Sequence, residues 1–435
     1  RDEPDLRELL YERNGSVFVL ADESQSGFRM FNTLDDQTID AAVNWSLALT
    51  QWSGLPVQFK FGGSYVDRTR DFTSRRFRFV PLDTSGVDLT LPGEQLYTTA
   101  NIGPVFELKE ETRVTDTYDA SQTIGSVYAM TDVSLSSRTR LIGGARIERF
   151  DQEVNTFDLF DFEGDPDVIT AKLENTDVFP AVNFVLGLAA DQNVRLSFSQ
   201  TVNRPEFREL APFEFTDIVG GRAVVGNPDL TRALIQNVDA RWELFPGGDQ
   251  VVAASLFYKR FNDPIERIVE PTAQLRTSFT NADSARNVGL ELEARGRFAE
   301  IVLLGANYTY VNSEITLAPA AAQVQTSLSR PLAGQSENLF NALAEVGTSA
   351  FSVRLLYNFS GDRISDVGSL GLPDIIENGR GAFDLAVSSR WRGLRVRVSA
   401  ENLGDEEYTF TQGSEVQRRF TLGRSVSLSI GVAAF

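Results

Sequence analysis

The sequence lacks the two residues that most often carry chemistry, since its 435 residues contain neither cysteine nor histidine. Without cysteine there are no disulfides, no thiolate nucleophiles and no zinc–cysteine sites. Without histidine the chain lacks the commonest general base and the commonest transition-metal ligand. Most hydrolytic and metalloenzyme mechanisms therefore lose their usual residues, and we expect no enzyme, no catalytic site, no metal site and no cofactor.

Long apolar runs and excess positive charge are also missing. The densest apolar stretch, Phe184 to Ala190, is far shorter than the about 18 residues of a membrane helix, so a helical membrane protein is excluded. The chain has 41 Lys and Arg against 60 Asp and Glu, a net charge of −19, which argues against a nucleic-acid partner. Hydrophobic residues make up 42%, enough to indicate a folded chain.

A strict period of two runs through much of the sequence. Between Asn287 and Phe298, apolar residues such as Val288 and Leu290 alternate with charged ones such as Glu291 and Arg295. Alternation puts successive side chains on opposite faces of a strand, one apolar and one wet. Two folds fit this pattern: a soluble sandwich with its apolar face inside, or a transmembrane barrel with its apolar face towards lipid and a polar interior.

Strand pairing and loop lengths favour the barrel. Alternating segments of about 11 to 14 residues exceed the usual soluble strand and are long enough to cross a bilayer. They form pairs joined by short turns: 39–51 with 55–68, 124–135 with 139–150, 178–188 with 194–202, then pairs around 246–250, 297–300, 346–350 and 390–394, and a last strand 424–435. Long polar loops separate the pairs. Short turns at one end and long loops at the other are typical of outer-membrane barrels, with brief periplasmic turns and long extracellular loops.

Aromatic residues support the same fold. Trp52, Trp242 and Trp391 stand beside short turns, whereas Tyr258 and Tyr357 stand towards the long loops. Two such belts are expected at the two membrane interfaces. We predict an all-β, antiparallel transmembrane β-barrel meander of about fifteen strands.

Several strings resemble a known family. The segments Ser197–Phe215, Val224–Pro246 and Leu256–Ile268, and the closing segments Ser399–Phe410 and Arg424–Phe435, are similar to consecutive strand-loop-strand blocks of TonB-dependent outer-membrane receptors. The resemblance implies a barrel of about 22 strands around an N-terminal plug. Nothing here resembles the plug or the energy-coupling segment, so we expect residues 1–435 to be the C-terminal portion of such a barrel, with 1–37 an extracellular loop or preceding strand region.

The end of the chain departs from the family pattern. Val426, Leu428 and Ile430 keep the apolar phase, whereas Phe435 falls on the other phase. Family members usually keep the terminal aromatic in the outward phase for assembly. A bulge near the end would restore that phase.

The resemblance also implies a function. It indicates a receptor in the outer membrane of a Gram-negative-type bacterium that binds a scarce large solute, of siderophore, cobalamin or glycan type, and imports it with TonB-coupled energy. The implied partners are membrane lipid, a TonB-type energy-coupling protein, the receptor's own plug and a small-molecule or oligosaccharide ligand. A passive porin-like channel is the alternative, and a soluble binding sandwich is a third hypothesis.

Two groups of residues are candidates for function. In the loop 203–231 the ligand-binding candidates are Arg204, Arg208, Glu209, Phe213 and Phe215; alternatively, prolines stiffen this loop and its charges pair locally. The candidates for the lumen, facing the plug or solvating the wall, are Asp239, Arg241, Glu243, Glu291, Glu293, Arg295, Arg395 and Arg397. Carboxylates between Asp158 and Asp167 could bind calcium, but they do not match an EF-hand loop, so a solvated acidic surface is favoured.

Overall fold

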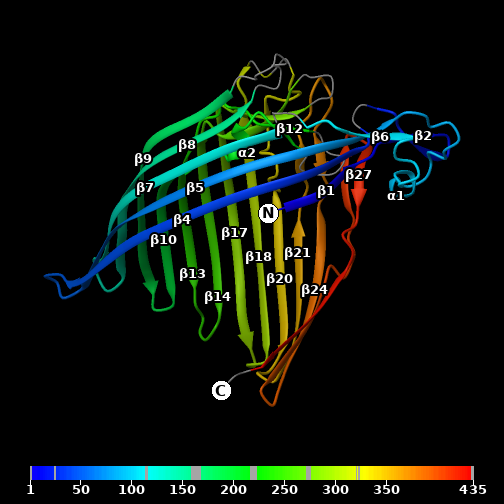
Figure 1. Ribbon diagram of the computed structural model, residues 1–435. Helices are drawn as coiled ribbons and strands as arrows, with labels where there is room; N and C mark the ends of the chain where they lie inside the picture. Colours follow the sequence, from blue (N-terminus) through cyan, green and yellow to red (C-terminus); the bar gives the residue numbers. More distant parts are fainter. Residues whose placement is uncertain are drawn as a thin grey trace.

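The computed structural model describes residues 2–23, 26–112, 116–157, 168–215, 223–270, 276–319, 321 and 324–432. Its main element is an antiparallel sheet of 18 strands (Figure 1). Successive ladders join the long strands in this order: β1 (Asp2–Glu8), β4 (Phe28–Thr50), β5 (Pro56–Pro81), β7 (Thr117–Ser134), β8 (Thr139–Phe157), β9 (Val168–Ala189), β10 (Gln192–Asn203), β13 (Ala233–Leu244), β14 (Val251–Asn262), β17 (Ser284–Phe298), β18 (Val302–Thr316), β20 (Asn338–Gly347), β21 (Phe351–Ser360), β24 (Arg380–Trp391), β25 (Leu394–Glu401) and β28 (Ser425–Val432). The short strands β6 (Phe106–Glu110) and β19 (Ser329–Arg330) pair with β5 and β18.

The structure confirms the predicted all-β meander. Every predicted pair of strands is a hydrogen-bonded hairpin, from β4–β5 to β24–β25, and the predicted last strand is β28. The N-terminal stretch contributes β1, which pairs with the start of β4. Figure 1 shows the sheet strongly curved, with the long connections gathered at the end where α2 and β12 lie.

Several strands are much longer than predicted. β4, β5 and β9 have 23, 26 and 22 residues, so the expected length of about 11 to 14 residues is wrong for them. Beyond the apolar band the ladder continues through polar pairs such as Asp36 opposite Arg70. Backbone pairing needs no apolar side chains, so these strands extend past the alternating pattern into what the sequence indicated as loops.

The register gives the sheet one apolar and one charged face. Leu256 stands opposite Leu290, whereas the next residues along, Ser255 and Glu291, stand opposite each other on the other face. On the apolar face Leu256 is 61% exposed, and so are large apolar side chains along most strands. This face has no cover of its own among the described residues at mid-strand, as expected for a wall that lipid covers.

The buried clusters lie at the long-loop end rather than in a layer behind the sheet. The largest contains Phe72, Tyr118, Phe150, Leu173, Phe207, Leu210 and Phe213. The loops also form two small four-stranded sheets. The first contains β11 (Glu214–Phe215), β12 (Val224–Val225), β16 (Thr277–Asn281) and β15 (Ile265–Val269), and the second contains β22 (Arg363–Asp366), β23 (Ile375–Glu377), β26 (Tyr408–Gln412) and β27 (Glu415–Phe420). The strands β2 (Tyr11–Asn14) and β3 (Val17–Leu20) form a separate hairpin. The helices α1 (Gly93–Leu96) and α2 (Phe207–Leu210) are single turns.

Three further points complete the fold. Among the described residues, no helix has the length and apolar character to cross a bilayer. Phe435, whose phase departs from the family pattern, lies outside the described residues. The acidic segment Asp158–Asp167 also lies outside them.

Candidate functional site

The described parts of the loop between β10 and β13, residues 204–215 and 223–232, fold into a compact element around α2. Glu206 caps α2 through a capping box, in which its backbone N–H donates to Glu209 Oε2 at 2.8 Å. The chain then turns back so that the Gly226 N–H donates to the Ala211 carbonyl at 3.0 Å. A Cβ on Gly226 would stand 2.1 Å from that oxygen, so the close approach requires glycine.

Arg204 fixes this loop to the charged face of the sheet. Its guanidinium lies 2.5 Å from Glu148 on β8, 3.7 Å from Asp177 on β9 and 4.2 Å above the ring of Phe150. Arg232, at the other end of the loop, binds the same Asp177 at 2.8 Å. The structure therefore places Arg204 beneath the loop, against the wall, with its side chain 12% exposed.

The other candidates in the loop have different surroundings. Phe213 is buried, with its ring edge-on to Phe72 at 5.1 Å, and the Arg208 guanidinium lies 5.7 Å from the same Phe72 ring. The backbone of Phe215 belongs to β11, but its side chain lies outside the described part. Glu209 is the candidate that lines an open cavity.

That cavity has a volume of about 550 Å³ and lies between four loop segments. Glu209 of α2 borders it on one side, Arg267 and Phe279 of β15 and β16 on another, and Arg363 and Glu377 of β22 and β23 on a third. Residues 332–335 complete the lining. We call this space the vestibule cavity. Because these segments come from different long loops, their meeting could not be read from sequence spacing.

The vestibule cavity is polar and carries both charges. The Arg363 Nε donates to Glu377 Oε2 at 2.8 Å. Burial raises the pKa of Glu209 above its usual value, while the hydrogen bond from the Glu206 N–H opposes that rise. A guanidinium and carboxylates around a cavity suit a polar solute that both donates and accepts hydrogen bonds.

A buried ion pair supports one wall of the cavity. Arg330 and Glu266 have side chains that are each 4% exposed, and both terminal nitrogens of Arg330 lie 3.3 Å from Glu266 Oε1. Arg330 also donates to the Arg267 carbonyl at 3.2 Å. Burial raises the pKa of Glu266, and the charge and hydrogen bonds of Arg330 oppose that rise. The pair joins β15 to β19.

The lumen candidates occupy the charged face. Arg195 and Arg241 stand directly opposite each other, and Glu243 accepts from them at 2.8 and 3.0 Å. Arg241 reaches across β14 to Glu293 on β17 at 2.9 Å, and on β14 itself it donates to Ser255 at 3.0 Å. Like charges in register are unfavourable unless a counter-charge bridges them, and here Glu243 does so.

The remaining candidates of this set share the face without joining that ladder. They are Asp239, Glu291, Arg295, Arg395 and Arg397. Arg397 donates to Ser399 at 3.1 Å on its own strand. Within the described parts of the chain, no three Asp or Glu side chains are grouped so as to hold a metal ion.

Two charged residues on the extended strand β5 also contact the α2 loop, although they are not among the predicted candidates. Arg68 and Arg70 on β5 both bind Asp36. Their guanidinium groups lie 5.0 and 5.2 Å from the ring of Phe207, so they contact α2. Their alternation continues that of β5, so extending the period of two beyond the apolar band would have placed them. The loop residues Arg363 and Glu377 follow no comparable pattern.

Comparison with known proteins identifies the fold. The family model described as TonB dependent receptor-like, beta-barrel, matches residues 6–403. The chain belongs to the TonB-dependent receptor β-barrel family. Members of this family are outer-membrane transporters rather than enzymes. The barrel therefore lies in a Gram-negative outer membrane, and its apolar face contacts lipid. The hypothesis of a soluble sandwich is wrong, and a passive porin-like channel is not favoured.

Solved structures share this fold. The siderophore receptor PiuA from Acinetobacter baumannii aligns with a TM-score of 0.64 at 15% identity, over 95% of this chain and 60% of that one. The ferric yersiniabactin uptake receptor FyuA from Yersinia pestis gives 0.58 at 17%, over 98% and 57%. The copper transporter OprC gives 0.57 at 16%, over 88% and 52%.

A curated relative is similar in sequence over part of the barrel. The iron-regulated outer membrane virulence protein of Vibrio cholerae is 25% identical over 262 residues, which cover 57% of this chain and 39% of that protein. The receptor barrel thus spans well under two thirds of the length of the relatives it matches.

Proposed function

We propose that this receptor barrel binds a large, scarce solute at its extracellular end and imports it with energy from a TonB-type protein. The observation that carries the proposal is the vestibule cavity of about 550 Å³, which several long loops build at one end of a transporter barrel. Its charged lining supports recognition of a polar solute before entry into the barrel.

The solute class that the observations favour is an organic iron chelate. PiuA and FyuA are described as receptors for a siderophore and for ferric yersiniabactin, and the relative from V. cholerae is iron-regulated. OprC transports copper, which soft sulfur and imidazole ligands select. The 435 residues offer no Cys or His and two Met, Met30 and Met130, on separate strands. A chelate supplies its own donor atoms to the metal, so such a solute needs only hydrogen bonds and charge from the wall. Cobalamin- and glycan-type solutes fit that requirement less directly, since no relative above is described as binding them.

Two partners belong to the same proposal. A plug segment of the full-length receptor occupies the space bounded by the charged face and contacts Arg241, Glu243 and Glu293. A TonB-type protein pulls on a segment next to that plug. The paired charges of the wall support this role, because a self-neutralised surface holds a polar segment without binding it irreversibly. The ligand candidate with the best geometry is Glu209, joined by Arg363 and Glu377, which the sequence did not indicate.

The test measures binding and uptake by the full-length receptor in outer membranes. We expect saturable binding of ferric chelates and uptake that stops when the inner-membrane energy source is dissipated. Arg363→Ala removes hydrogen bonds to a charged group, so affinity should fall about tenfold, near 1.4 kcal/mol.

The matched control is Arg286→Ala. Arg286 forms an exposed ion pair with Glu314 on β18, outside the vestibule cavity. This variant should bind the chelate as the wild type does. Absence of saturable binding across ferric chelates, or uptake that persists without energy, would refute the proposed function.

A further inference from the structure

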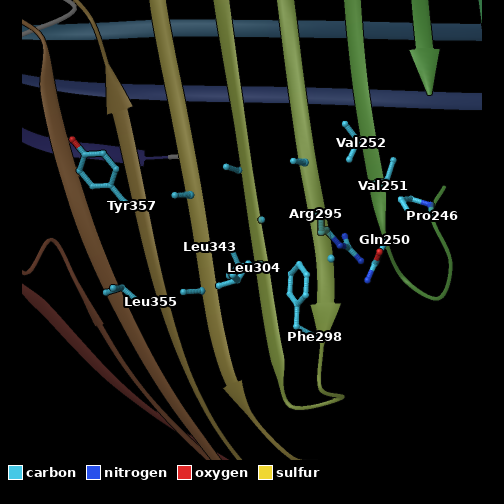
Figure 2. Close-up of a pocket in the computed structure, with 16 residues that line it drawn as sticks. Pro246, Gln250, Val251, Val252, Arg295, Phe298, Leu304, Leu343, Leu355 and Tyr357 are labelled. Atoms are coloured by element: carbon cyan, nitrogen blue, oxygen red, sulfur yellow. The ribbon is translucent and has the colours of Figure 1, made fainter. Parts of the chain in front are cut away.

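A second depression lies on the apolar face of the barrel, close to the short turns (Figure 2). It has a volume of about 500 Å³ and extends across five neighbouring strands, β14, β17, β18, β20 and β21. The residues labelled in Figure 2 run from Tyr357 on β21 to Pro246 and Gln250 in the turn before β14. We call it the lipid-side groove.

Small residues in register form the floor of this groove. Ala294, Ala306 and Ala342 stand directly opposite one another on β17, β18 and β20. The same row continues to Val252 on β14 and to Tyr357 on β21. Three neighbouring strands thus present only methyl groups to the membrane at the same level.

Larger side chains form the two long rims. Two residues further from the short turns, the row on β17, β18 and β20 is Leu292, Tyr308 and Phe340. Nearer to those turns, the matching row is Phe298, Val302 and Val346. Between floor and lower rim lies a row that mixes Gly296 and Ala344 with Leu304 and Leu355. The result is a trench that crosses the strands and is closed along both sides.

We propose that the lipid-side groove binds one acyl chain of a phospholipid from the periplasm-facing leaflet. The groove opens towards the bilayer, and its lining is almost entirely apolar, so its occupant comes from the membrane. It lies beside the short turns, which face the periplasm in this family. The row from Val252 to Tyr357 covers four strand spacings, about 19 Å. One leaflet of the hydrocarbon core is about 15 Å thick, so the groove is long enough for one acyl chain of that leaflet.

The shape of the groove selects a flexible chain over a second barrel. The floor is lowest in the middle of a convex wall, so a neighbouring convex wall would touch only the rims and leave the floor empty. An empty apolar floor loses dispersion contacts, whereas a single hydrocarbon chain can follow the trench and contact both rims. Gln250 at the end of the groove offers an amide to the ester or headgroup region.

The experiment counts phospholipids bound to the full-length receptor, purified in mild detergent, by native mass spectrometry. Ala306→Phe fills the floor and should reduce phospholipid retention at least fivefold. The control is Ala240→Phe, on the same apolar face between Leu196 and Leu256 and outside the groove. It should retain phospholipid as the wild type does. Folding of each variant is checked by heat-modifiable gel migration.

Three outcomes would overturn the proposal. The first is equal retention by the two variants. The second is a wild-type dimer without bound phospholipid that Ala306→Phe converts to a monomer, since a second copy would then fill the groove. The third comes from a separate experiment that needs no variant to fold. In it, wild-type receptor is placed in vesicles that contain a phospholipid with a photoactivatable group in its acyl chain. Crosslinks should concentrate on residues 294–306 and 342–344, and an even distribution over the apolar face would exclude a groove-bound chain.

Discussion

Breaking the buried ion pair between Arg330 and Glu266 should destabilise one wall of the vestibule cavity. Each side chain is 4% exposed, so neither charge is compensated by water. Removing one partner of a buried pair costs about 3 to 5 kcal/mol because the other charge stays buried alone. We therefore expect Arg330→Met to lower the local stability of β15 and β16 by that amount.

The double variant Glu266→Leu with Arg330→Met should recover part of this loss. Replacing a buried pair by apolar groups is often neutral, but the Arg267 carbonyl that accepts from Arg330 at 3.2 Å would lose its donor. An unsatisfied buried carbonyl costs about 1 to 3 kcal/mol. The double variant should thus be more stable than the single variant by about 2 kcal/mol.

The single variant should also show a definite pH dependence. Burial already raises the pKa of Glu266, and loss of Arg330 removes the main influence that lowers it. A carboxyl with a folded pKa above its unfolded value near 4.3 keeps its proton in the folded state. Its contribution to stability is fully present below the unfolded pKa and is lost as pH rises through the folded pKa. The destabilisation by Arg330→Met should therefore grow as the pH rises above the unfolded pKa near 4.3.

Hydrogen exchange of the full-length receptor, followed on residues 265–269 and 277–281, measures these changes. The control is Arg286→Met, whose ion pair with Glu314 has side chains 59% and 41% exposed. Exposed pairs contribute at most about 1 kcal/mol, so this variant should exchange almost as the wild type does. Unchanged exchange in Arg330→Met, or a double variant less stable than the single one, would refute the reasoning.

Two further predictions concern the sheet and the α2 loop. Leu290→Arg puts a charge on the apolar face and should cost about 2 to 4 kcal/mol in urea unfolding from vesicles, whereas Glu291→Arg, on the charged face, should cost far less; equal losses would contradict the assigned faces. Gly226→Ala, whose Cβ would stand 2.1 Å from the Ala211 carbonyl, should speed proteolysis of the α2 loop. Gly125→Ala, with open space around the new Cβ, should not; indistinguishable digestion would show that the close approach is not required.

The strands and their faces could be predicted because one energetic contribution dominates, the cost of placing a charged side chain in lipid. An alternation error of one residue would put Arg295 or Arg397 into lipid, at a cost of about 2 to 4 kcal/mol each, so the sequence must carry the correct phase in every strand. The hairpin partners followed from the short turns, which leave antiparallel pairing with the next strand as the simplest geometry. The structure confirms both.

The vestibule cavity could not be predicted in the same way. Arg363 and Glu377 stand in irregular loops, where no period relates one residue to the next and contacts depend on how distant loops pack. Arg204 and Phe213 are ligand-binding candidates in the sequence, yet the Arg204 side chain lies against the wall and is only 12% exposed, and Phe213 is buried. The sequence alone does not distinguish such an Arg from an exposed one. Its counter-charge, here Glu148, comes from a strand that is distant in the sequence.

The extended strands explain how a membrane constraint reaches the candidate binding site. Lipid fixes the phase of β5 and β8 within the bilayer. The ladder preserves that phase beyond the bilayer, because a shift of one residue would turn every side chain of the strand to the opposite face. Arg68, Arg70 and Glu148 therefore arrive on the same face as the charged wall and bind the α2 loop there. The vestibule cavity thus rests on a loop whose anchoring residues are set by the membrane register, while its lining residues, such as Arg363, lie in loops that this register does not constrain. Substitutions in the lining can change the solute without moving the anchors, which is how one barrel fold can serve different solutes.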